Sequence, residues 1–310
     1  MEFTFYYYTP SAAAGGIFAG LFGVCTILHL YQLLHTRTWF MIPFAIGGAC
    51  KSLPIARDIA GLTQPVETVG YIGRVLSSTE APNFTKGPYV MQSALILIAP
   101  AFLAASIYMT LGRIIAMLDA ERCSIIPLRF LTKIFVAGDV LSFLMQASAN
   151  ETGAGIMVKD EKSADTGEKI IVGGLFVQII FFAFFVLTAA VFEVRMARQR
   201  VPVSLELQSI WRRHMMALCF TSVLILIRSV VRVVEYLMGY DSYMMKQEVF
   251  IYVFDALLMF IVVFTLNWIH PSEINCALGR GRTYFWRVVA IRKFATPTVE
   301  MEEGRLSSHK

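Results

Sequence analysis

The chain has 310 residues, of which 56% are hydrophobic and 16% are charged, and its mean hydropathy is +0.62. A soluble domain needs a more polar surface than this composition supplies, so we expect an all-α membrane protein whose main solvent is the lipid bilayer. The formal net charge of +5 does not indicate a nucleic-acid partner here, because the basic residues lie between apolar stretches and in the tail, where they report topology.

The N-terminal segment, residues 1–13, has no Lys or Arg ahead of an apolar stretch, so we expect an extracellular N-terminus without a cleavable signal peptide. Seven apolar stretches follow, each near or above the roughly 20 residues that cross the hydrocarbon core as a helix. The predicted spans are residues 14–34, 38–76, 89–112, 129–149, 170–193, 214–237 and 248–269. Together they form a membrane domain over residues 14–269, followed by a basic cytosolic tail over residues 270–310.

The second predicted span, residues 38–76, is interrupted. Lys51, Pro54, Arg57 and Asp58 fall in the middle of it, where charges and proline are costly. A short re-entrant or outer loop that shields these groups is one explanation.

A retained intron over residues 50–66 is the other explanation. The codons open to Cys50-Lys51-Ser52 include the donor-like run GTAAGT, and Pro65-Val66 permits an acceptor. Splicing would join Ala49 through one Phe or Leu to Glu67 and leave a single regular span. We therefore hypothesise that residues 50–66 are largely untranslated sequence.

Positive charge alternates between the connections. Arginines gather after the third span, after the fifth span and in the tail, whereas the remaining connections are poor in net positive charge. Because short cytosolic connections are rich in Lys and Arg, we expect the N-terminus outside and the C-terminus in the cytosol. Two Asn-X-Thr triplets, at Asn83 and Asn150, fall in connections predicted to face outward and are candidate glycosylation sites of a glycoprotein.

Several predicted spans carry a polar residue at a similar depth. Counted from the predicted outer boundaries at about 1.5 Å per residue, Asp139, Gln178, Arg228 and Asp255 lie roughly 12 to 15 Å below the outer surface. Glu67 joins this level if the intron hypothesis holds. The candidate residues of a polar cavity are Glu67, Arg74, Asp139, Gln146, Gln178, Arg228, Arg232, Glu235, Glu248 and Asp255.

Spacings of three and four residues place these groups in stripes along their helices. One interpretation is that ion pairs lock the helices together, Arg228 with Asp255 and Arg232 with Glu235 or Glu248. The other is a hydrated cavity in the outer half, whose carboxylates receive a cationic head group. His29 lies in the cytosolic half of the first span, and we interpret it as a hydrogen-bonded packing residue.

Short motifs along nearly the whole chain resemble the fungal RTA-like lipid-translocating exporter family, which is named for resistance to 7-aminocholesterol. They run from Tyr8-Thr9-Pro10-Ser11 through Glu67-Thr68-Val69-Gly70-Tyr71-Ile72-Gly73-Arg74, Ala99-Pro100-Ala101, Gly138-Asp139-Val140-Leu141-Ser142, Gly174-Leu175 and Arg232-Val233-Val234-Glu235-Tyr236 to His270-Pro271. The chain departs from the family pattern at the interruption before Glu67 and at Ala149-Asn150-Glu151, where a glycine-rich run is expected.

The resemblance implies a seven-helix lipid translocator or exporter that gives cells resistance to stress from toxic amphiphiles, such as sphingoid long-chain bases or sterol analogues. Its partners would be membrane lipids, with a lipid flippase or regulatory protein as further partners, and its location the plasma membrane or otherwise an endomembrane. A receptor-like regulator of lipid asymmetry is the alternative. We expect no enzyme, metal or cofactor, since His29 is the one histidine inside a predicted span and cannot form a metal or catalytic cluster with other histidines there. We also expect no nucleotide site, since the motif GxxxxGK[ST] is absent.

Overall fold

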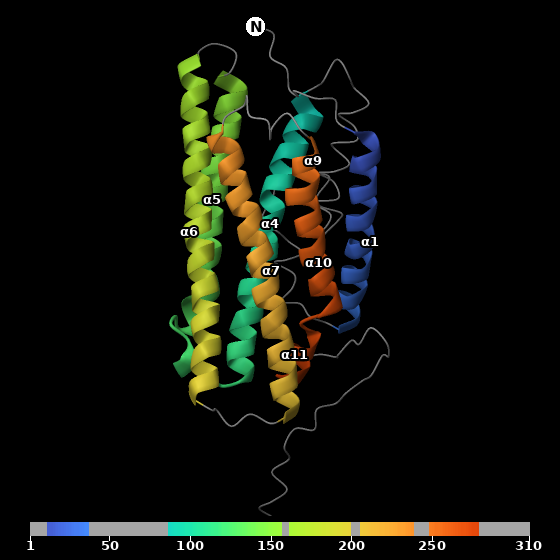
Figure 1. Cartoon of the computed structure of the whole chain (residues 1–310), viewed down its shortest axis with the longest axis vertical. Coiled ribbons are helices and arrows are strands. Elements are labelled where there is room, and N and C mark those ends of the chain that lie inside the picture. The colour runs from blue at the N-terminus through green and yellow to red at the C-terminus, as the bar shows by residue number, and fades with distance from the viewer. Residues whose placement is uncertain (1–10, 37–85, 157–160, 200–204, 239–247, 279–310) are drawn as a thin grey trace, which may run out of the picture.

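The computed structural model describes residues 11–36, 86–156, 161–199, 205–238 and 248–278. All regular elements within these ranges are helices (Figure 1). The long ones are α1 (Ala12–Thr36), α4 (Lys86–Met117), α5 (Leu128–Ile156), α6 (Glu161–Gln199) and α7 (Leu205–Leu237). The shorter ones are the 3₁₀-helix η3 (Glu121–Cys123), α9 (Glu248–Ile251), the π-helical segment η4 (Tyr252–Leu257), α10 (Leu258–Trp268) and α11 (Ser272–Ala277).

The helices form a bundle in which α4, α5, α6 and α7 run in alternating directions, whereas α1 runs in the same direction as α4 (Figure 1). α5 packs between α4 and α6, and α7 contacts α4, α6 and α10. α1 packs on α10, and α11 turns back against α4 and α7. Below, the two ends of the bundle are called the α9 end, at the top of Figure 1, and the α11 end, at the bottom.

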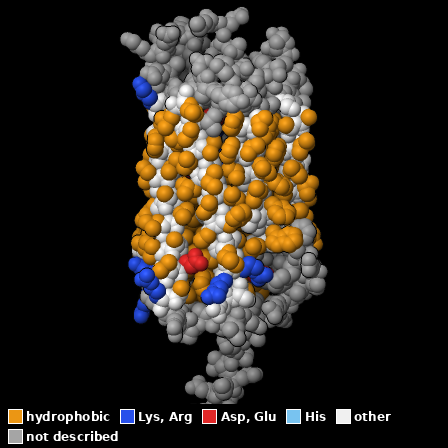
Figure 2. Space-filling model, in the orientation of Figure 1, with side chains coloured by type: hydrophobic (Ala, Val, Ile, Leu, Met, Phe, Trp, Pro, Cys, Tyr) orange, Lys and Arg blue, Asp and Glu red, His pale blue; other side chains and the backbone are white. Residues whose placement is uncertain are grey.

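Five of the described helical segments are long and apolar enough to cross a membrane: Ala13–Thr36, Ala99–Met117, Lys169–Arg198, Leu207–Leu237 and Tyr252–Ala277. Figure 2 shows hydrophobic side chains over the middle of the visible face, with Lys and Arg mostly toward the α11 end. Large apolar side chains such as Ile27, Ile180 and Val249 are more than 60% exposed, which suits contact with lipid tails rather than water. The chain is therefore a polytopic helical membrane protein.

The finer topology stays a prediction. α5, predicted as the fourth span, has 29 residues but is not among the five segments. The second predicted span, with the hypothetical intron at 50–66, lies outside the described residues. At the other boundary, residues assigned to the start of the tail pack into the bundle, since Ser272 to Cys276 are buried in α11.

The core extends through the bundle, and its part between α4, α5 and α6 is rich in aromatic rings. Tyr108 packs against Phe135, Phe182 and Phe185 at ring-centroid distances of 5.3, 6.1 and 4.5 Å. α5 and α6 approach closely at Gly174, where an added Cβ would lie 3.0 Å from the backbone oxygen of Ser142. This packing fixes the positions of the polar residues on α5.

Candidate functional site

The polar residues of α7 meet the helix that carries Asp255. The guanidinium of Arg228 forms an ion pair with the Asp255 carboxylate, and both residues are buried. One turn along α7, Arg232 Nη1 donates a hydrogen bond of 3.1 Å to Glu235 Oε2. The first pair was predicted from depth and spacing, and the second is one of the two alternatives predicted for Arg232, Glu235 or Glu248. Each arginine thus neutralises a carboxylate within the apolar belt of the bundle.

Asp255 lies in a π-helical segment rather than in a regular helix. η4 follows the single turn of α9 and leads directly into α10. Its buried residues are Tyr252, Asp255 and Ala256. Such segments within helices occur often at functional sites. The sequence predicted a regular helix here, so the π-helical turn is a feature that it did not reveal.

A small pocket lies beside these ion pairs. Its volume of about 10 Å³ is roughly the space that one water molecule needs. The rings of Phe250 and Phe254 are stacked, with centroids 6.1 Å apart. Lining residues are Arg228, Val231, Arg232, Glu235, Phe250, Phe254 and Asp255, and this set is called the α7–η4 pocket below. In this conformation it has room for a water or an ammonium group but for nothing larger.

A second polar group joins α5 to α6. Ser142 Oγ donates a hydrogen bond of 2.7 Å to the backbone oxygen of Gly174. Gln146 Nε2 donates to Ser142 Oγ at 2.7 Å and lies 3.5 Å from Gln178 Oε1. These contacts join α5 to α6 beside Gly174.

Asp139 stands apart from both groups. It is 4% exposed, and the hydroxyl of Tyr108 on α4 lies close enough to interact with its carboxyl. Between α6 and α7 lies an apolar cluster built on Ile171, Leu175 and Val233. The polar level predicted across several helices is thus divided, in the described residues, into separate clusters instead of one cavity.

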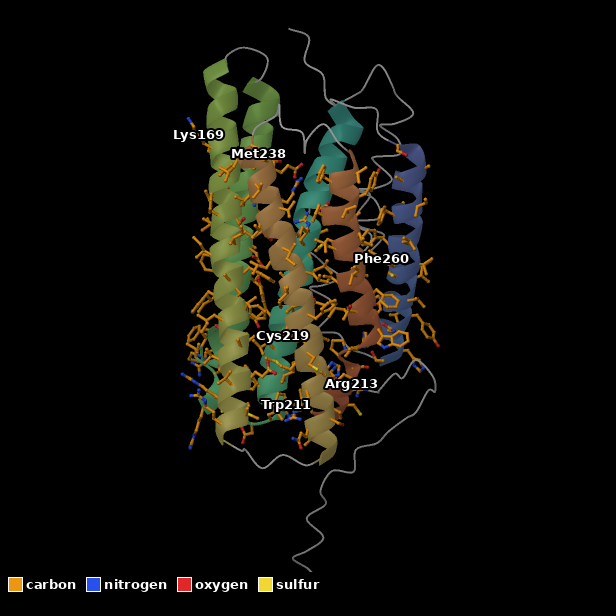
Figure 3. All side chains as sticks on the ribbon, in the orientation of Figure 1. Lys169, Trp211, Arg213, Cys219, Met238 and Phe260 are labelled. Atoms are coloured by element: carbon orange, nitrogen blue, oxygen red, sulfur yellow. The ribbon has the colours of Figure 1, made fainter. Side chains whose placement is uncertain are left out.

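A polar cluster at the α11 end was not predicted from the sequence. Glu273 on α11 accepts hydrogen bonds from Arg213 Nη2 at 2.7 Å and lies 3.2 Å from His214 Nε2. Asn275 accepts a hydrogen bond from Arg113 on α4. These contacts fasten α11 to α4 and α7 near the residues Trp211 and Arg213 labelled in Figure 3.

The same end also fastens α1 to α10. His29 Nδ1 lies 3.0 Å from Asn267 Oδ1, and Asn267 Nδ2 donates to the backbone oxygen of Cys25 at 3.1 Å. His29 is therefore a hydrogen-bonded packing residue, as its position in the first span indicated. Its ring lies 5.5 Å from that of His270. The sequence did contain a signal for the cluster around Glu273, namely the polar residues Ser272, Glu273 and Asn275 directly after an apolar span. That run was assigned to the tail.

Other predicted residues stay untested by the structure. Glu67, Arg74 and Asn83 lie outside the described residues. Glu248 begins α9 and Asn150 lies in α5, but their side chains are outside what the structure describes.

Comparisons with known proteins place the chain in a family. The family model described as RTA1 like protein matches residues 61–276. Protoporphyrin uptake protein 1 of Saccharomyces cerevisiae is 37% identical over 284 residues, which cover 86% of this chain and 91% of that protein. Protein RTA1 of the same organism is 37% identical over 272 residues, covering 84% of this chain and 83% of that protein. Sphingoid long-chain base transporter RSB1 of Saccharomyces cerevisiae is 26% identical over 285 residues, covering 81% of this chain and 69% of that protein. No solved structure matches the chain. Because the family model spans most of the bundle and two relatives exceed a third in identity over most of their length, this chain belongs to the RTA1-like family of membrane proteins.

Proposed function

We propose that this chain translocates cationic amphiphiles, such as sphingoid long-chain bases, and that the α7–η4 pocket receives their head group. The observation that carries the proposal is a pair of carboxylates, Glu235 and Asp255, beside a water-sized pocket in the apolar belt. The primary ammonium of a sphingoid base is about as large as a water molecule. It would take the place of an arginine at one of the two carboxylates, so that this carboxylate keeps a cationic partner while the displaced guanidinium turns to water.

The surroundings of the pocket suit an attached hydrocarbon tail. Val234 on α7 and Val253 in η4 flank the pocket residues and are 38% and 41% exposed. A tail could leave the pocket between them into the lipid without burying a polar group. The stacked rings of Phe250 and Phe254 offer faces that attract an ammonium group. One relative carries the name sphingoid long-chain base transporter, which supports the substrate class.

The predicted orientation completes the proposal. With the α9 end outside, the pocket lies in the outer half of the membrane, and the protein would export amphiphiles at the plasma membrane or otherwise at an endomembrane. Resistance of cells to toxic amphiphiles would follow from that export.

A receptor-like regulator of lipid asymmetry is the second candidate. The observation that favours it is the closed state of the pocket, which has room for about one water, together with the clusters that fasten the helices at both ends. In that case the ion pairs would hold a signalling conformation, and a flippase or regulatory partner would move the lipid.

Reconstitution in liposomes separates the two candidates. Purified wild-type chain should speed the transfer of a fluorescent sphingoid base between leaflets more than that of a fluorescent phospholipid. Asp255→Asn should slow this transfer by roughly tenfold or more, because a hydrogen bond to a charged group contributes about 1.5 to 3 kcal/mol. Glu121→Gln, a matched change at an exposed site outside the pocket, should leave the rate unchanged. Folded wild-type protein without any transfer would favour the regulator.

A further inference from the structure

In the described part of the bundle, every buried acidic residue except one has an arginine partner. The buried acidic residues there are Asp139, Glu235, Asp255 and Glu273. Three of them have an arginine partner, namely Arg232, Arg228 and Arg213. Asp139 has no basic partner within the described ranges, and neither of its carboxyl oxygens completes a hydrogen bond there.

The surroundings of Asp139 supply no charge to balance it. From α4, the Tyr108 hydroxyl lies beside the carboxyl and is itself buried without a well-aligned hydrogen-bond partner. From α6, Phe181 packs on the neighbouring Gly138. Among the described residues that face Asp139 from these helices, the one titratable group is therefore Tyr108, which is neutral at physiological pH.

Electrostatics then decides the state of the carboxyl. An ionised carboxylate without a partner in an apolar interior costs many times more free energy than a neutral polar group. A neutral carboxylic acid has an O–H that can donate a hydrogen bond and a carbonyl oxygen that can accept one, and the Tyr108 hydroxyl beside it can do both. We propose that Asp139 holds a bound proton in this conformation and is the site through which the chain couples to a proton gradient.

The coupling step conserves atoms and charge. When the packing of α4, α5 and α6 opens to water, the O–H bond of the acid breaks and the proton passes to water, while the electron pair stays on the carboxylate. The carboxylate cannot be buried again until it takes up a proton from the other side. This coupling rests on the proposed translocation of amphiphiles, whereas proton binding by Asp139 does not.

Infrared spectroscopy of the full-length chain in lipid nanodiscs tests proton binding directly. A protonated carboxyl has a C=O stretch well separated from the bands of a carboxylate. We expect this band at neutral pH in the wild type, its loss in Asp139→Asn and its retention in Asp255→Asn, whose acid is ion-paired. Asp139→Glu, which keeps a carboxyl, should shift the band instead of removing it. Identical carbonyl spectra for the wild type and both Asp139 variants would overturn the proposal, since Asp139 would then be ionised.

Transport under a pH gradient tests the coupling. In liposomes, transfer of the fluorescent sphingoid base by the wild type should change at least several-fold when the gradient is imposed or reversed. Asp139→Asn should lose this response, because an amide of the same shape carries no exchangeable proton, whereas Asp139→Glu, which keeps a carboxyl, should retain it. A gradient response that persists in Asp139→Asn would overturn the coupling. Wild-type protein that moves no lipid but shows the infrared band would contradict the proposed function, while proton binding by Asp139 would still be supported.

Discussion

Gly174 illustrates how single residues position the polar groups of this bundle. A Cβ at this position would lie 2.9 Å from Gln146 Cγ and 3.0 Å from the backbone oxygen of Ser142. The second atom belongs to the backbone, so it cannot move aside without shifting α5 itself. Glycine therefore permits the short hydrogen bond from Ser142 to the Gly174 carbonyl.

Replacing Gly174 with Ala should lower the stability of the protein. We expect a loss of roughly 1 to 3 kcal/mol, the usual cost of overpacking a close contact. Gly173→Ala is the matched control, because its Cβ would meet only Met145 Cε at 3.6 Å, an ordinary contact. That change should be neutral or stabilise the helix by up to about 1 kcal/mol. Thermal unfolding in detergent measures both, and equal effects would show that α5 and α6 are not packed closely at Gly174.

At the scale of helices, α11 is a six-residue element that depends on side-chain contacts. A helix this short does not form by itself in water. It is held by Glu273, which contacts Arg213 and His214, and by Asn275, which contacts Arg113. Removing the Glu273 carboxylate should therefore release the segment without unfolding the long helices.

Cysteine labelling measures that release. Cys276 lies in α11 and is 6% exposed, so a hydrophilic maleimide should label it slowly in a chain that keeps Cys276 as its single cysteine. Glu273→Ala should raise the labelling rate by roughly tenfold or more, since each lost hydrogen bond to a charged group contributes about 1.5 to 3 kcal/mol. Glu121→Ala, at an exposed position of η3, is the control and should leave the rate unchanged. Slow labelling of the Glu273→Ala variant would show that other contacts hold α11.

The second predicted span gives a test at the level of the transcript. We expect the dominant cDNA to lack most of the codons for residues 50–66, so that the protein is correspondingly shorter by mass spectrometry. A dominant transcript that retains those codons would support the re-entrant or outer loop instead, and Lys51, Arg57 and Asp58 would then need partners in the protein.

At the scale of the whole molecule, the sequence predicted the positions of the helices better than their arrangement around one another. Apolar stretches locate the described spans because the bilayer requires length and hydrophobicity. Counting residues placed Arg228 and Asp255 at a similar level, and the ion pair predicted from that placement is present. Depth does not give the direction in which a side chain points around the bundle, and for this reason the sequence did not show that Asp139 lies beside Tyr108 rather than beside an arginine. The π-helical turn at Asp255 and the return of α11 depend on packing, which has no local pattern in the sequence.

The predicted orientation of the whole chain is tested at its two termini. An epitope tag at the N-terminus should be accessible on intact cells, and a tag at the C-terminus only after the membrane is permeabilised. Asn83→Gln should also remove a glycan and increase electrophoretic mobility. Tags that report the same side would contradict a seven-span topology with the N-terminus outside.

The helix α7 carries parts of both polar ends of the molecule, Arg213 and His214 near one end and Arg228 to Glu235 near the other. Arg213 and Arg232 are separated by about 29 Å at 1.5 Å per residue, and no described residue of this helix departs from α-helical structure to form a hinge between them. A rigid-body tilt of α7 that moves its Arg228–Glu235 end away from η4 would therefore move Arg213 and His214, at its other end, in the opposite direction. A stiff rod with an anchor at each end makes the two faces of the membrane mechanically dependent on each other, so that loosening the bundle on one side strains the contacts on the other.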